Sequence, residues 1–70
     1  MKNQYTALIK QEGEWWYGWI EEVPGVNCQE PTKDTLLASL KETLREALEF
    51  NRIDALNAAG EAFIEEKIAV

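Results

Sequence analysis

The chain has 70 residues, one cysteine and no histidine, and its 13 acidic against 7 basic residues give it a net charge of −6. This length allows one domain, and a domain of this size buries only about 60% of the surface that its unfolded chain exposes. An intramolecular disulfide and the common zinc-ligand sets are excluded, so we expect self-association or a partner protein to add stability. The acidic balance argues against direct nucleic-acid binding and favours a basic partner.

The sequence shows no sign of a membrane or secretory segment. No apolar run approaches the roughly 20 residues of a membrane span, and the first ten residues, MKNQYTALIK, lack the pattern of a signal peptide. We therefore expect a cytoplasmic protein that does not contact a membrane. Cys28 is expected to be reduced and to act as a small apolar filler without a catalytic task.

Three short segments have the period-2 alternation of β-strands: residues 5–10, 15–21 and 26–29. Gly13 lies among polar residues between the first two segments, at the spacing of a hairpin. Pro24 has no N–H to donate and Gly25 can adopt a positive φ, so this pair predicts a tight turn or bulge before the third strand.

A helix is predicted after the third strand. Thr32 stands at the N-cap position, and Asp34 in the first turn complements the helix dipole. One apolar stripe then recurs at three-and-four spacing through Leu36, Leu37, Leu40, Leu44, Ala47 and Leu48. A weaker helical pattern continues to Gly60, which suits the position after a helix end.

Beyond Gly60, residues 62–70 carry three apolar side chains on one face of a predicted final strand: Ile64, Ile68 and Val70. The predicted fold is therefore α+β with the order β-β-β-α-β, an antiparallel sheet covered by one main helix. Residues 1–70 are expected to form this single domain.

The second predicted strand is rich in aromatic residues on both faces. One face carries three rings, here called the aromatic row: Trp15, Tyr17 and Trp19. The other carries Trp16, Gly18 and Ile20, and Gly18 would let a helix approach closely. One helix covers only one face, and monomers seldom leave three large rings bare. Core packing explains any one of these residues best, but an interface explains the set better.

The order of these motifs resembles the HicB family of antitoxins, in particular its short forms. The resemblance is carried by YTALIK, by GEWWYGWIEEVPGVNCQ and by the Thr-initiated leucine helix ending in REALEF, and it runs from Tyr5 to Val70. It implies a domain similar to a truncated ribonuclease H fold that masks the active surface of HicA, a small basic RNA-cleaving toxin. HicB proteins commonly form dimers or higher oligomers.

The chain also departs from the family pattern. Thr35 stands where the family often has the Glu of a capping box, although Thr32 keeps the cap position. Many HicB proteins carry a C-terminal DNA-binding segment, and none follows the last predicted strand here. A separate DNA-binding domain and direct operator binding are therefore not expected.

The functional expectation is an antitoxin-like protein that neutralises a HicA-type toxin by occupying its basic groups. The contact is expected on the sheet side and at the EEVPG corner. Candidate residues for the partner or oligomer interface are Trp15, Tyr17, Trp19, Glu21, Glu22 and Pro24, and the structural turn and cap residues are Pro24, Gly25 and Thr32. For Trp19, packing in the core or in a dimer seam is an equal alternative. The alternative function is an orphan HicB-like oligomeric domain without a toxin.

An enzymatic function is not expected. Two-metal nuclease chemistry needs carboxylates that converge, and neighbouring strand residues such as Glu21 and Glu22 point to opposite faces. Glu65 and Glu66 fail for the same reason. No histidine is present to activate Cys28 or a hydroxyl group. We therefore expect no catalytic residue, metal or cofactor.

Overall fold

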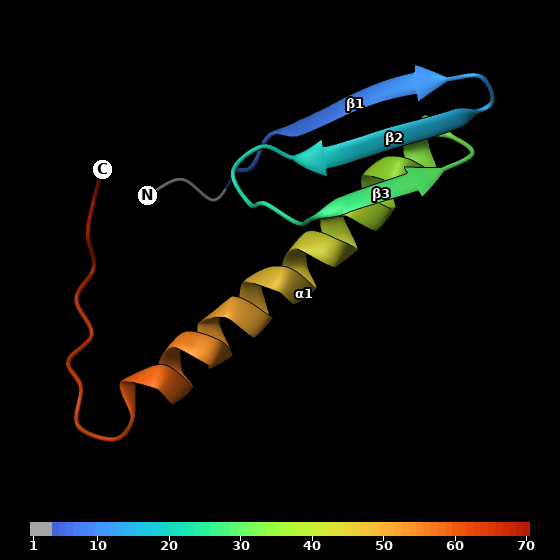
Figure 1. Cartoon of the computed structure of the whole chain (residues 1–70). Helices are drawn as coiled ribbons and strands as arrows, with labels where there is room; N and C mark the ends of the chain where they lie inside the picture. Colours follow the sequence, from blue (N-terminus) through green and yellow to red (C-terminus); the bar gives the residue numbers. More distant parts are fainter. Residues whose placement is uncertain (1–3) are drawn as a thin grey trace.

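The computed structural model describes residues 4–70 and shows a three-stranded sheet followed by one long helix (Figure 1). The strands are β1 (Ala7–Glu12), β2 (Trp15–Ile20) and β3 (Asn27–Glu30), and the helix is α1 (Lys33–Ala59). Both strand pairs are antiparallel and β2 is the central strand. The predicted α+β class, with an antiparallel sheet and one main helix, is confirmed.

The register of the sheet follows from its two turns. The first turn joins β1 to β2 around Gly13 and pairs Glu12 with Trp15. The second follows Ile20, whose N–H donates to the carbonyl of Val26 over 3.1 Å. Gly25 has a φ of 92°, a conformation that side chains with a Cβ rarely adopt, so glycine makes this tight return possible.

The ends of α1 lie where the capping residues predict. Thr32 is the N-cap, and its hydroxyl oxygen accepts the backbone N–H of Thr35 over 3.1 Å. The hydroxyl of Thr35 donates back to the carbonyl of Thr32 over 3.0 Å, so Thr35 provides a local bond where the capping box would have a Glu. At the other end, Gly60 has a φ of 80° and its N–H donates to the carbonyl of Leu56.

The core lies between the sheet and the first half of α1. Its fully buried members are Leu36 and Leu40, and Ile20 and Val26 are nearly so. Further partly buried side chains surround them: Ala7, Ile9, Trp16, Val23, Cys28, Leu44 and Ala47. The helix therefore covers the face of β2 that carries Trp16, Gly18 and Ile20.

Gly18 allows this close packing, as predicted, but leucine side chains and not the helix backbone fill the space. A Cβ at Gly18 would lie 2.8 Å from Cδ1 of Leu40 and 3.1 Å from Cδ2 of Leu36. A second contact, between α1 and β3, is polar: the hydroxyl of Ser39 donates to the carboxylate of Glu30 over 2.7 Å. Both contacts fix α1 against β2 and β3.

The structure differs from the prediction in one element, since residues 61–70 form no strand. The 27 residues of α1 make a helix about 40 Å long, whereas a six-residue strand spans about 20 Å. The chain therefore leaves the helix well past the end of the sheet, as Figure 1 shows. The alternating pattern of Ile64, Ile68 and Val70 has no strand edge beside it there with which to pair.

Candidate binding face

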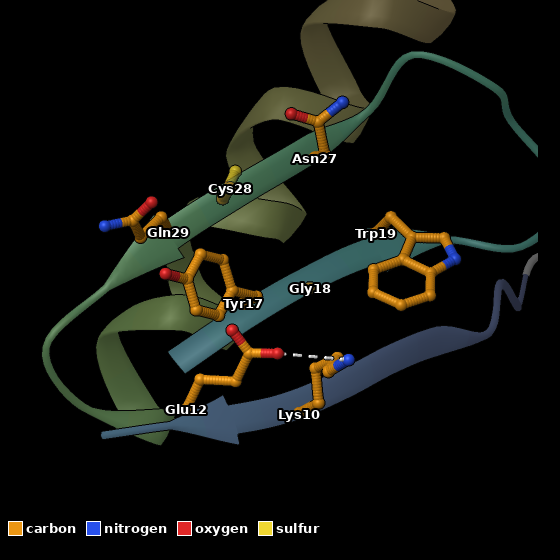
Figure 2. A pocket seen from close by; sticks show the side chains of 8 residues that line it. All are labelled: Lys10, Glu12, Tyr17, Gly18, Trp19, Asn27, Cys28 and Gln29. Atoms are coloured by element: carbon orange, nitrogen blue, oxygen red, sulfur yellow. Dashed lines mark ion pairs between the residues drawn. The ribbon is translucent and has the colours of Figure 1, made fainter. Parts of the chain in front are cut away.

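The sheet face opposite α1 is uncovered and carries the aromatic row, of which Figure 2 shows Tyr17 and Trp19. The strand register sets its neighbours, because Lys10 pairs with Tyr17, and Tyr17 pairs with Gln29 on its other side. We call this surface the open face, and by alternation and register it consists of Leu8, Lys10, Glu12, Trp15, Tyr17, Trp19, Asn27 and Gln29.

The rings of the aromatic row are accessible on this face. Trp15 is 45% and Trp19 is 42% exposed, and Tyr17 is half-buried. Figure 2 shows Tyr17 and Trp19 projecting on the same side of the sheet, beside a shallow depression of about 450 Å³. Trp19 is therefore not a core residue of this chain, and the open alternatives for it are a partner contact and a dimer seam.

The polar residues of the open face surround the rings. Lys10 Nζ lies 3.3 Å from Glu12 Oε2, and both side chains are more than half exposed, so this ion pair contributes little stability. Asn27 and Gln29 present side-chain amides from β3, which can both donate and accept hydrogen bonds (Figure 2). The face thus offers flat apolar rings together with groups that can satisfy a polar ligand.

Acidic residues stand at both ends of the open face. Glu12 ends β1 and Glu14 lies in the turn that leads to β2, and Glu21 and Glu22 follow the other end of β2. Between residues 4 and 30 the sequence has five acidic residues and one lysine. Because aromatic faces also attract cations, this surface favours a ligand that carries positive charge.

The predicted candidates at the EEVPG corner differ in whether their side chains are already engaged within the chain. The carboxylate of Glu22 accepts the backbone N–H of Thr6 over 2.8 Å and the hydroxyl of Thr6 over 2.7 Å. Glu22 therefore ties the corner to the chain before β1. Glu21 uses its backbone N–H to bond the carbonyl of Thr6, which leaves its exposed side chain outside this contact, and Pro24 is exposed as well.

The structure thus brings Trp15, Tyr17 and Trp19 together on one face and places Glu21 and Pro24 at the turn beyond its end. The sequence prediction missed the neighbours that other strands contribute, chiefly Leu8, Lys10, Asn27 and Gln29. The alternation within residues 5–10 already set Leu8 and Lys10 apart from the more apolar face of that strand. Only the pairing register shows that they lie beside Trp19 and Tyr17.

Cys28 lies on β3 and packs, partly buried, on the core side. Its Sγ is 3.5 Å from the hydroxyl oxygen of Thr43 on α1. This environment agrees with the predicted role of a small filler between β3 and the helix.

Two features of residues 4–70 bear on the class of site. No group of three or more His, Cys, Asp or Glu side chains there is arranged to hold a metal ion. In the same part of the chain, no helix combines the length and the apolar character that crossing a membrane requires.

Comparison with models of protein families, with curated proteins and with solved structures gives no match for this chain. The resemblance to HicB antitoxins therefore rests on the order of the sequence motifs alone.

Proposed function

We propose that this chain is an antitoxin-like binding protein of the cytoplasm that neutralises a small basic RNA-cleaving toxin of the HicA type. The observation that carries the proposal is the open face, on which the aromatic row lies uncovered between acidic ends. The HicB-like order of motifs supports the same function. The protein acts by binding, and no covalent step is required of it.

The chemistry of the open face suits such a partner. A toxin that cleaves RNA holds phosphates with arginine and lysine side chains, and these can stack on exposed tryptophan rings. Each cation–π contact contributes about 0.5–2 kcal/mol, with the larger values where water is excluded. Glu21 at one end and Glu14 at the other add attraction that speeds the encounter. A toxin held in this way has its phosphate-binding groups covered and cannot bind RNA.

The test begins with a short, basic, histidine-containing protein encoded beside this chain. The purified pair is mixed, and cleavage of a fluorescent RNA is measured against the concentration of this chain. We expect Glu21→Lys to slow association by about tenfold at low salt, with the difference shrinking as salt is raised. Trp19→Gln should mainly speed dissociation, because it removes a contact and not a long-range charge.

Glu42→Lys is the matched control for charge. It makes the same charge change on an exposed position of α1, away from the open face. Glu22 is a poorer position for this test, because reversing its charge would also break its hydrogen bonds to Thr6. If Glu21→Lys and Glu42→Lys inhibit equally well at low salt, the acidic corner is not the contact.

The second candidate is an orphan HicB-like domain that self-associates without a toxin. The exposure of the aromatic row is compatible with it, since rings of this kind also form dimer seams. Failure of the wild-type chain to bind or inhibit the neighbouring basic protein, or the lack of such a neighbour, would favour this candidate.

A further inference from the structure

The second half of α1 extends beyond the sheet (Figure 1). Ala47 is the last helix residue that packs against the core, and α1 continues to Ala59. Continuing the stripe of Leu40, Leu44 and Ala47 by three-and-four steps leads to Asn51 and Asp54, both polar. Residues 48–59, here called the projecting half, therefore do not extend the core of the same chain.

The projecting half has an apolar stripe of its own. Phe50 is 70% and Ile53 is 47% exposed, and their spacing of three places them side by side on the helix surface. The tail after the helix adds Ile64 and Ile68, which are 86% and 82% exposed. These four large apolar side chains are all exposed, and three of them are exposed by 70% or more.

The total surface shows how much this arrangement leaves uncovered. The chain exposes 6046 Å², whereas a compact monomer of its mass exposes roughly 4,450 Å². Its radius of gyration is 15.3 Å, against about 11 Å for a compact domain of this length. The excess, roughly 1,600 Å², is about twice the area that each partner contributes to a standard stable interface.

We infer that the projecting half of α1, together with residues 61–70, forms a two-fold interface with a second copy of this chain. Two such helices packed antiparallel bring Phe50 and Ile53 of each copy against the same residues of the other, which is the self-complementary contact that a two-fold axis generates. The projecting half and the tail hold part of the excess area of the chain, and the whole excess is larger than what one partner contributes to such a contact.

The segment is net acidic, so the apolar contact between two copies has to outweigh a repulsion between them. Residues 49–70 contain five acidic residues together with Arg52 and Lys67. Arg52 Nη1 lies 3.3 Å from Glu49 Oε1 in its own helix, and both side chains are mostly exposed. On the helix surface Glu49 lies at the edge of the apolar stripe, so in an antiparallel pair it stays at the rim of the contact, where water and salt screen the repulsion. The inference is independent of the proposed function, and it leaves the open face available.

Sedimentation equilibrium of the full chain at micromolar concentration tests the inference. The wild type should sediment with the mass of two chains of 8.0 kDa each. Phe50→Glu/Ile53→Glu should raise the dimer dissociation constant by at least about 100-fold, since four charges would enter an apolar contact. Both positions lie outside the core, so the variant should keep the circular dichroism of the sheet and of the first half of α1.

Trp15→Glu/Trp19→Glu is the matched control, because it places two glutamates at exposed apolar positions of the open face. This variant should remain dimeric. Dissociation of this variant would place the seam on the open face and overturn the inference. A monomeric wild type, or a Phe50→Glu/Ile53→Glu variant that stays dimeric, would overturn it as well. Amide exchange provides a second readout, since residues 49–59 should exchange faster in the dissociated variant than in the wild type.

Discussion

Replacing Gly18 by alanine should destabilise the fold, because the sheet and helix meet most closely there. The new Cβ would lie 2.8 Å from Leu40 Cδ1, 3.0 Å from Ile9 Cγ2 and 3.1 Å from Leu36 Cδ2. These atoms end flexible side chains, but Leu36 and Leu40 are fully buried and have little room to move. Overpacking of this kind costs about 1–3 kcal/mol.

Part of this cost is offset, because alanine loses less backbone entropy than glycine in a strand, by about 0.5–1 kcal/mol. With the middle of each range, the net loss should be about 1.3 kcal/mol in the free energy of unfolding. An unfolding entropy of about 2.1 cal/mol/K per residue then implies that Tm falls by roughly 9 °C for a chain of this length.

Thermal and urea unfolding of four proteins would test this reasoning: the wild type, Gly18→Ala, Leu40→Ala and the double variant. Leu40→Ala alone should cost about 2–5 kcal/mol. In the double variant the new methyl group occupies space that Leu40 vacates, so the cost should be smaller than the sum by about 0.5–3 kcal/mol. A Gly18→Ala variant as stable as the wild type, or strictly additive costs, would refute the packing argument.

Three further predictions concern single side chains. Thr32→Ala should lower the free energy of unfolding by about 0.5–2 kcal/mol through loss of the N-cap, whereas Thr32→Ser should keep most of the stability that the cap provides. Equal stability of the two variants in urea would contradict this. Trp16→Ala, next to the core, should destabilise by several times as much as Trp15→Ala on the open face, and similar Tm values would show that the faces are misassigned. Cys28→Ser should cost less than about 1.5 kcal/mol, because a serine hydroxyl can keep the contact with Thr43; loss of the folded state on calorimetry would contradict it.

Local sequence was sufficient to predict most of the elements. Gly25 marks a turn and Thr32 a cap because each acts through its own backbone conformation or through a bond within a few residues. The leucine stripe of α1 and the alternation of β2 depend only on the periods of helix and strand. Gly18 favoured one face of β2 for the helix, but with aromatic rings on both faces the choice stayed open until the structure placed Leu36 and Leu40 against Gly18.

The composition of the open face required the tertiary structure. Trp15, Tyr17 and Trp19 share a face through alternation, but Asn27 and Gln29 join them only through the register between β2 and β3. Glu22 bonds Thr6, sixteen residues earlier in the chain, and no local pattern shows that its carboxylate is committed in this way. Contacts between distant segments depend on how the strands are brought together, which a periodic pattern does not encode.

The last ten residues show the same division between local pattern and spatial arrangement. Their sequence determined an alternating apolar pattern after a helix-ending Gly60, and the helix does end there. Whether such a segment becomes a strand depends on an available edge to supply hydrogen bonds, because a lone strand cannot satisfy its own backbone groups. The length of α1 places its end well past the sheet, and in Figure 1 the residues that follow run back apart from the strands, so the tertiary structure, and not their own sequence, leaves them without that edge.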